Sequence, residues 1–173
     1  MAQPGAVRVG AKEGTLKVGI FIDGGYLQRI LKDVFGEPSI DHKQLSEEMA
    51  RGKDILRTYY YDCLPYQGNP PSQEESRRVS AKQKFFSYLN NLPKYQVQEG
   101  TLAYRGRDNN GRPIFVQKGI DVKISVDMLL LAAQRSISEA ILVSGDSDLL
   151  PAVIGVKNFG VNVTLGHVQS SGV

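Results

Sequence analysis

The sequence predicts an α/β fold with a mainly parallel central sheet and a projecting β-hairpin. Short apolar strand patterns alternate with helical patterns along the chain, which is typical of this class. Two of the strand patterns run directly into acidic turns, Asp23-Gly24-Gly25 and Ser144-Gly145-Asp146-Ser147-Asp148. Because α/β folds bind ligands at the carboxyl ends of their strands, these turns mark the expected functional edge of the sheet.

Bulk composition indicates one globular domain that does not span a membrane. The chain has 173 residues, of which 41% are apolar and 23% charged, and no apolar run approaches the ~18 residues that a membrane helix needs. We expect a disordered lead over residues 1–15 and one domain over 16–173. The single cysteine, Cys63, excludes an intrachain disulfide and a thiolate zinc site, so a reducing cytoplasm is the expected location.

The first half of the chain contains two strand patterns and two helical patterns. The β-branched run Val18–Ile22 is the first strand, and the apolar spacing of the next residues indicates a helix that Gly36 and Pro38 end. Asp41 can cap a short helix that extends to about Arg51. The aromatic run Ile55–Cys63 has high β-propensity and is the second strand.

The second half opens with a long helix that Ser72 caps, since Glu75 completes a capping box, and that Pro93 closes. Two extended arms and the turn dipeptide Asn110-Gly111 between them predict a hairpin. The remaining patterns predict alternating helices and strands. The segments, in order, are the arms Tyr95–Tyr104 and Arg112–Gln117, a helix over Gly119–Arg135, a strand over Ala140–Val143, a helix over Ser147–Lys157 and a strand over Val161–Leu165.

The acidic turns carry more carboxylates than helix capping requires. Asp23 has an ordinary structural role as the N-cap of the following helix, and Asp146 and Asp148 share that alternative. One helix needs only one cap, however, and two acids two residues apart repel each other unless a cation lies between them. Hard ions such as Mg²⁺ and Mn²⁺ take oxygen ligands, so the pattern favours a divalent metal site that includes Asp121.

The helix that begins near Gly119 contributes two further acids with different geometry. Asp121 lies in its first turn, whereas Asp127 projects about 120° away around the helix axis and has a structural alternative as the partner of Lys123. Lys118 could bind a phosphate oxygen or neutralise the acids. Ser144 and Ser147 could donate to phosphate, although hydroxyls in tight turns are more often local caps.

Charge is distributed unevenly around this acidic focus. The net charge is only +3, yet basic residues outnumber acids between Ser72 and Arg112, and acids outnumber bases between Gly119 and Leu150. A basic arm beside an acidic focus suits a polyanion, while an ordinary solvated surface is the alternative. Tyr104 beside Arg105 and Arg107 on the hairpin is a candidate for stacking on a base.

Three motifs resemble those of NYN domains, the LabA-like branch of the PIN-like nuclease superfamily. The motifs are Ile20-Phe21-Ile22-Asp23-Gly24-Gly25-Tyr26, Lys118-Gly119-Ile120-Asp121-Val122 with Val126-Asp127-Met128-Leu129, and Ser144-Gly145-Asp146-Ser147-Asp148 with Pro151. The resemblance extends from about Val18 to Leu165. It implies a Rossmann-like, three-layer α/β/α sandwich with a metal-dependent ribonuclease site at the carboxyl edge of the sheet.

The resemblance also implies roles for single residues. The acidic cluster of the family matches Asp23, Asp121, Asp146 and Asp148, with Asp127 as a further acidic position, and Ser144 matches the serine before the paired acids. Many relatives carry an asparagine where this chain has Tyr26. A tyrosine cannot supply the same short amide, so one substrate contact of the family is in question here.

We therefore expect a metal-dependent endoribonuclease that uses Mg²⁺ or Mn²⁺ and binds single-stranded or structured RNA. A non-catalytic module that binds nucleic acid or protein around a structural metal is the main alternative. A phosphatase of the haloacid dehalogenase type is a further alternative. Its chemistry needs an acid two residues after the first aspartate, and Gly25 at that position argues against it. The oligomeric state is open, with a homodimer as one option.

Overall fold

The computed structural model describes residues 17–111 and 113–166, and five of its strands form one parallel sheet. The predicted lead over residues 1–15, Arg112 at the start of the second predicted arm, and the chain beyond Gly166 lie outside the described residues. The strand order is β3-β2-β1-β6-β7, with every neighbouring pair parallel. The strands are β1 (Lys17–Asp23), β2 (Asp54–Asp62), β3 (Tyr95–Glu99), β6 (Glu139–Val143) and β7 (Asn162–Gly166).

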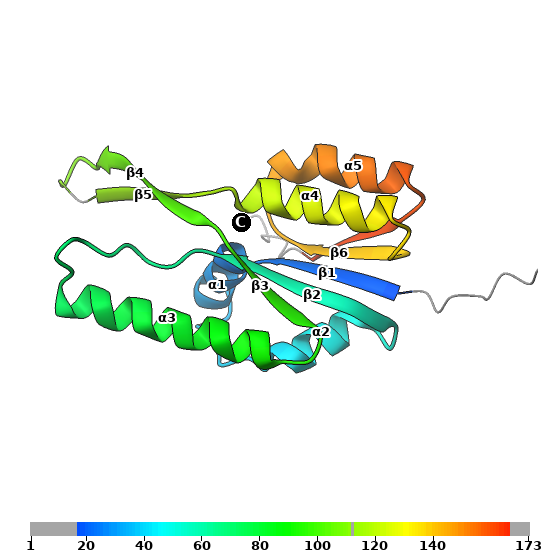
Figure 1. Ribbon diagram of the computed structural model, residues 1–173, viewed down its shortest axis with the longest axis horizontal. Helices are drawn as coiled ribbons and strands as arrows, with labels where there is room; N and C mark the ends of the chain where they lie inside the picture. Colours follow the sequence, from blue (N-terminus) through cyan, green and yellow to red (C-terminus); the bar gives the residue numbers. More distant parts are fainter. Residues whose placement is uncertain (1–16, 112, 167–173) are drawn as a thin grey trace, which may run out of the picture.

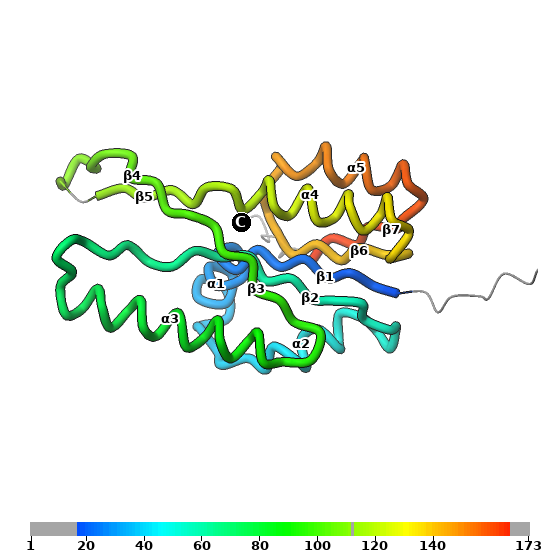
Figure 2. The backbone as a smooth tube through the Cα atoms, in the orientation of Figure 1, coloured from blue at the N-terminus to red at the C-terminus, as the bar shows by residue number. Residues whose placement is uncertain are grey.

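Helices cover both faces of the sheet, which confirms the predicted three-layer sandwich (Figure 1; Figure 2). Side chains alternate across a strand, so Phe21 and Tyr61 pack toward one helical layer, and Ile20 and Tyr60 pack toward the other. Parallel sheets need this double cover because both of their faces are apolar. The first layer contains α4 (Ile120–Ala133) and α5 (Leu150–Asn158), and the second contains α1 (Gly24–Asp33), α2 (His42–Ala50) and α3 (Gln73–Asn91).

The predicted helix caps are present. The Asp41 carboxylate accepts a hydrogen bond from the backbone N–H of Gln44 at 3.0 Å and starts α2. At the start of α3, the Ser72 hydroxyl accepts from the Glu75 N–H at 3.1 Å, and the Glu75 carboxylate accepts from the Ser72 N–H at 2.8 Å. This reciprocal pair is the capping box that the sequence predicts.

The extended arm predicted over Tyr95–Tyr104 is wrong in one respect, because the chain divides at Gly100. Residues before Gly100 form β3 of the main sheet, and those after it form β4 (Thr101–Arg107), which pairs antiparallel with β5 (Pro113–Lys118). A Cβ atom on Gly100 would lie 2.6 Å from Ile120 Cδ1 and 2.9 Å from Cys63 Sγ, so any larger residue at this crossing would force the Ile120 and Cys63 side chains to shift. The hairpin of β4 and β5 projects beyond the sheet (Figure 1).

The helix predicted over Ser147–Lys157 also has a different start. Ser147–Leu149 form a short 3₁₀ turn, η1, and α5 begins at Leu150. Pro151 in the first turn of α5 has no N–H group to satisfy, which suits a helix start. In the part of the chain that the structure describes, no helix combines the length and apolar character that crossing a bilayer requires.

The chain reverses its direction of strand addition at β1. From β1 it adds β2 and β3 on one side, and later β6 and β7 on the other. The register pairs Ile22 of β1 with Val143 of β6, so Asp23 and Ser144 follow side by side at the carboxyl edge. This is the topological switch point, where open α/β sheets form their binding crevice.

Candidate metal and nucleic-acid site

A cavity of about 650 Å³ opens at the switch point and brings three of the predicted acids together. Asp23 comes from the end of β1, Asp121 from the first turn of α4, and Asp146 from the turn after β6. We call this hollow the acid cavity. Its other lining residues are Gly25, Tyr26, Arg29, Val116, Gln117, Ile120, Gly145 and Ser147.

Asp23 combines a structural and an electrostatic role. Its Oδ1 atom accepts a hydrogen bond from the backbone N–H of Tyr26 at 3.0 Å and caps α1, as the structural alternative predicts. Burial raises the pKa of Asp23 most, and the negative charge of Asp121 raises it further against the lowering effect of that hydrogen bond. The carboxylates of Asp23 and Asp121 therefore repel each other across the acid cavity.

Asp121 is placed by a glycine with left-handed backbone geometry. Gly119 has φ of 81° and precedes α4, so the chain turns sharply from β5 into the helix. Burial raises the pKa of Asp121, and the charges of Asp146 and Asp148 add to this rise. The acids of three separate chain segments thus repel one another at one point.

The turn after β6 is held by its own side chains. The buried Ser144 hydroxyl accepts a hydrogen bond from the Asp146 N–H at 3.2 Å, and Asp146 Oδ1 accepts from the Asp148 N–H at 2.8 Å. Ser147 lines the acid cavity, whereas Asp148 is exposed and does not line it. Ser144 is therefore a local cap, and Asp148 acts on the cavity through its charge.

The remaining predicted residues lie farther from the three acids. Asp127 accepts a hydrogen bond from the Tyr61 hydroxyl at 2.9 Å and is absent from the acid cavity. Lys118 is exposed at the end of β5, two residues before α4. Arg105 is exposed on β4, while Arg107 donates to the Gly111 carbonyl at 2.7 Å and stabilises the hairpin turn.

The Tyr26 ring contacts Arg29, a cation that the sequence analysis did not identify. Its ring packs over Gly145, where a Cβ atom would lie 2.5 Å from Tyr26 Cε2. The guanidinium carbon of Arg29 lies 5.6 Å from the centroid of the Tyr26 ring, within cation–π range. Arg29 also lines the acid cavity, so it brings positive charge to a cavity lined with three acids.

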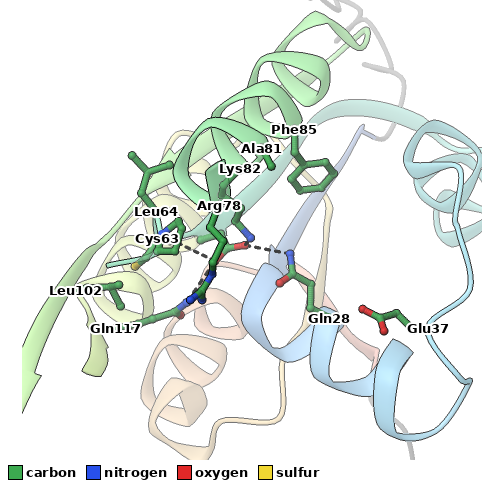
Figure 3. Close-up of a pocket in the computed structure, with 12 residues that line it drawn as sticks. Gln28, Glu37, Cys63, Leu64, Arg78, Ala81, Lys82, Phe85, Leu102 and Gln117 are labelled. Carbon is green, nitrogen blue, oxygen red and sulfur yellow. Dashed lines mark hydrogen bonds and ion pairs between the residues drawn. The ribbon is translucent and has the colours of Figure 1, made fainter. Parts of the chain in front are cut away.

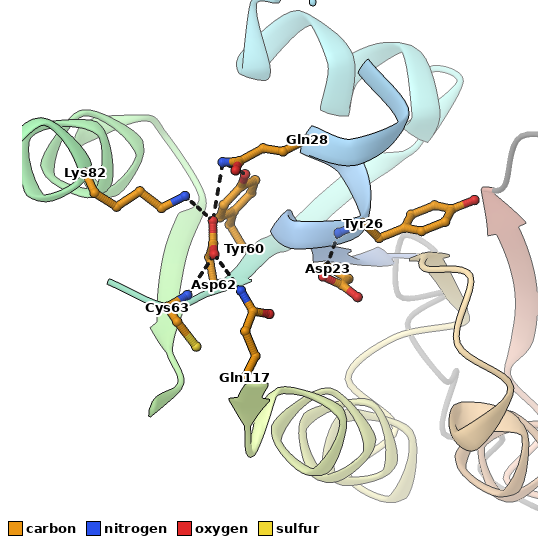
Figure 4. A network of polar contacts seen from close by, with 8 residues as sticks. All are labelled: Asp23, Tyr26, Gln28, Tyr60, Asp62, Cys63, Lys82 and Gln117. Atoms are coloured by element: carbon orange, nitrogen blue, oxygen red, sulfur yellow. Dashed lines mark hydrogen bonds and ion pairs between the residues drawn. The ribbon is translucent and has the colours of Figure 1, made fainter. Parts of the chain in front are cut away.

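A fourth acid at the same edge, Asp62, is buried and surrounded by donors (Figure 4). It ends β2, forms an ion pair with Lys82 of α3, and accepts from the Cys63 N–H at 2.7 Å. The side-chain amides of Gln28 and Gln117 donate to it at 3.4 Å and 3.2 Å. Sequence reasoning missed Asp62, although its place at a strand end was the same signal that identified Asp23.

The NYN domain family model matches residues 17–171. The chain belongs to the NYN domain family. Members of this family are generally nucleases that use divalent metal ions, and RNA is the substrate that membership implies. The family model spans the three segments that supply the acids of the acid cavity.

One protein is similar to this chain in sequence, and one solved structure is similar to it in fold. The chain is 49% identical over 49 residues to the uncharacterized protein y4oD of Sinorhizobium fredii (strain NBRC 101917 / NGR234), a match that spans 28% of this chain and 23% of that protein. The crystal structure of VPA0982, a protein of unknown function from Vibrio parahaemolyticus RIMD 2210633, aligns with a TM-score of 0.61 at 18% identity. That alignment covers 90% of this chain and 83% of the other, and it shows a shared fold.

The acids of this NYN domain suit a hydrated divalent ion. Among residues 17–111 and 113–166, no three His, Cys, Asp or Glu side chains are grouped so that they could ligate one ion directly. Mg²⁺ keeps several of its waters and is held by one or two carboxylates, so it does not require a closed protein cage. Burial raises the pKa of Asp23 and Asp121 most, and repulsion by neighbouring acids adds to the rise; a bound cation relieves this repulsion.

Replacing Lys82 with methionine should destabilise the protein by about 3 kcal/mol, because it leaves the Asp62 carboxylate buried without its ionic partner. Urea denaturation measures the change. Lys84→Met, on the exposed side of the same helix, is the matched control and should change stability by less than about 0.5 kcal/mol. Equal losses in the two variants would mean that the buried ion pair contributes nothing specific.

Asp121→Asn should raise the melting temperature of the metal-free protein at neutral pH by a few degrees. The pKa of Asp121 in the folded state lies above its ordinary value of 3.8, so the folded protein binds this proton more tightly than the unfolded chain does. Wild type should therefore lose stability relative to Asp121→Asn as pH rises from 3.8 through the raised pKa, and the difference should then stay constant.

Thermal melts in EDTA across this pH range test the effect. Asp33→Asn, an exposed position on α1, is the control and should follow wild type. A difference between wild type and Asp121→Asn that does not vary with pH would contradict the raised pKa.

Proposed function

We propose that this NYN domain is a metal-dependent endoribonuclease that hydrolyses RNA phosphodiesters at the acid cavity. The observation that carries the proposal is the convergence of Asp23, Asp121 and Asp146 on one open cavity at the switch point of the sheet. Membership of a family that generally consists of nucleases supports it. The basic character of the neighbouring α3 and hairpin suits a polyanionic substrate.

The three cavity-lining acids are proposed to hold hydrated Mg²⁺ or Mn²⁺, with one or two of them as direct ligands and the rest bound to its waters, and Asp148 is near enough to add negative charge. A bound divalent ion supplies an activated water for hydrolysis and offsets the charge that builds on the phosphate. In this proposal Asp127 is not a direct ligand, because the Tyr61 hydroxyl donates to it outside the acid cavity. The hydrogen bond between Tyr61 of β2 and Asp127 joins α4 to the sheet.

Cationic and polar groups at the rim are the proposed phosphate contacts. Arg29, held over the Tyr26 ring, can pair with a phosphate oxygen at the acid cavity, where the tyrosine stands in place of the family's asparagine. Ser147 lines the same cavity and can donate its hydroxyl. Lys118 lies at the junction of the hairpin and α4, and Arg105 lies on the other strand of the hairpin.

One observation favours a second candidate, a module that binds RNA without cleaving it. In the described part of the chain, the acids are not grouped tightly enough to ligate an ion directly. A labelled RNA strand incubated with Mn²⁺, Mg²⁺ or EDTA decides between the two functions. Cleavage with metal and none with EDTA supports the nuclease, whereas tight binding with no cleavage supports the module.

Asp146→Asn should abolish cleavage while leaving the metal-free protein as stable as wild type or more so. Asparagine is as good an N-cap as aspartate, so it can keep the 2.8 Å bond from the Asp148 N–H, and the lost charge reduces repulsion. An amide is a poorer ligand for a hard cation, so activity should fall by orders of magnitude. Mn²⁺ should raise the melting temperature of wild type more than that of the variant.

Asp33→Asn is the control for charge and should cleave like wild type. An Asp146→Asn protein that melts well below wild type without metal would show that the carboxylate is mainly a structural cap. One that cleaves RNA at the normal rate would remove Asp146 from the site.

Arg105→Ala should weaken RNA binding and reduce the slope of log affinity against log salt by about 0.7, the contribution of one phosphate contact with a single strand. Arg107→Ala should reduce it less, because its guanidinium is already bonded to the Gly111 carbonyl. Anisotropy titrations of labelled RNA at several salt concentrations provide the slopes. The control is Arg57→Ala near the amino end of β2, and an unchanged slope for Arg105→Ala would exclude a phosphate contact.

A further inference from the structure

Three aromatic rings meet on the hairpin, outside the two buried cores of the domain. The Tyr66 ring, from the loop after β2, stacks on Phe115 of β5 with 4.4 Å between the ring centroids and 23° between the ring planes. Tyr104 of β4 lies opposite Phe115, and the centroids of these two rings are 5.8 Å apart. We call the three residues the hairpin aromatic cluster.

The two tyrosines of this cluster keep much of their surface in solvent. Tyr66 is 46% exposed and Tyr104 is 58% exposed, whereas Phe115, which contacts both, is partly buried. Rings that only brace a hairpin are expected to bury their faces, because aromatic side chains stabilise a structure mainly through the area that they remove from water. The exposed surface of Tyr66 and Tyr104 is therefore available to a further flat ring.

A second cavity, of about 780 Å³, adjoins the cluster and is walled by α3 (Figure 3). We call it the α3 cavity. Gln117 of β5 lines both this cavity and the acid cavity, so the two hollows share a wall. Pro65, which also lines the α3 cavity, immediately precedes Tyr66 of the cluster.

The pairing of β4 with β5 places the cluster and the α3 cavity along one face of the hairpin. Leu102 pairs with Gln117, and both line the α3 cavity. Tyr104 and Phe115 form the pair two residues further along, and side chains two residues apart lie on the same face of a strand, about 7 Å from each other. One continuous face therefore leads from the edge of the acid cavity to the aromatic rings.

Positive charge borders this face. Arg78 and Lys82 of α3 line the α3 cavity, and because Lys82 is ion-paired with Asp62, Arg78 is the cation that can pair with a phosphate (Figure 3). Arg105 is exposed next to Tyr104 in β4. Proteins that bind single strands combine a positively charged groove with aromatic side chains on which bases stack, and the α3 cavity with its cluster has both.

We propose that the hairpin aromatic cluster stacks on bases of a single RNA strand that extends from the acid cavity through the α3 cavity. The inference rests on the proposed nuclease function and adds to it a binding site away from the acids. Every base has a flat π-face, so the contact tolerates any base. The bases of a duplex are already stacked on one another, so the cluster selects single-stranded over double-stranded RNA.

Anisotropy titrations of a labelled single strand with the Asp146→Asn protein test the contact without cleavage. Tyr104→Ala on this background should weaken binding about tenfold, and Tyr104→Phe should restore it, because the ring and not the hydroxyl stacks. The slope of log affinity against log salt should stay the same, since no phosphate contact is lost. Affinity for an RNA duplex should not change. Phe159→Ala, at a ring of similar exposure after α5, is the matched control.

Fluorescence provides a measurement that keeps a ring at the site. The chain contains no tryptophan, so Tyr104→Trp on the same background introduces a single reporter. A single RNA strand should quench its fluorescence by stacking on it, whereas a duplex should not. The reporter in Phe159→Trp should respond to neither.

Unchanged affinity of Tyr104→Ala for the single strand, an equal loss for single strand and duplex, or no quenching in Tyr104→Trp overturns the inference. If Tyr104→Ala unfolds the protein, Tyr66→Ala carries the same expectation. Failure of the proposed function has a different signature, since wild type would then not cleave RNA with Mn²⁺. A wild type that cleaves while Tyr104→Ala binds normally loses only this inference, and a wild type that does not cleave but shows the tenfold effect and the quenching keeps it.

Discussion

The parallel pairing of β1 with β6 is the constraint on which the site depends. It aligns Ile22 with Val143, so the residues that follow both strands leave the sheet together. The chain adds strands to opposite sides of this pair, which opens a crevice between the two following loops. Asp23 and Asp146 face this crevice, and α4 carries Asp121 into it from above the sheet. A slip of one residue in this register would separate the acids.

Three of the four acids at this edge fall into two electrostatic classes. Asp62 is buried, ion-paired with Lys82 and surrounded by amide donors, so its charge is balanced within the protein. Within the described residues, neither Asp23 nor Asp121 forms an ion pair, and each has a pKa raised by burial and by a neighbouring acid. The first arrangement holds the Gln117 side chain in the wall of the acid cavity. The second leaves negative charge uncompensated where a cation and a phosphate could meet.

The sequence predicted most of the architecture because local chemistry determines it. The capping box at Ser72 and the cap at Asp41 are short-range signals, and both are present. The division of the extended arm at Gly100 could not be predicted in this way. It depends on Ile120 and Cys63, which approach Gly100 only in the folded chain.

In the candidate site too, residues with a local sequence signal were predicted, and residues whose roles depend on contacts of the folded chain were not. Asp23, Asp121 and Asp146 were found because acids after strands or at a helix start meet at one sheet edge. Asp62 gave the same signal but was read as part of its strand, and its partner Lys82 lies on a helix with no sequence pattern that connects the two. Gln28, Gln117 and Arg29 have no signature at all, because their roles depend on contacts made across the fold.

The central claim is that the acid cavity binds a divalent ion, and calorimetric titration of Mn²⁺ into the metal-free protein tests it most directly. Wild type and the Asp33→Asn control should bind Mn²⁺ with the same affinity. Asp23→Asn should bind it at least about tenfold more weakly, because one of three converging carboxylates is lost. Equal Mn²⁺ affinity in all three proteins, or no binding to wild type, would contradict the account.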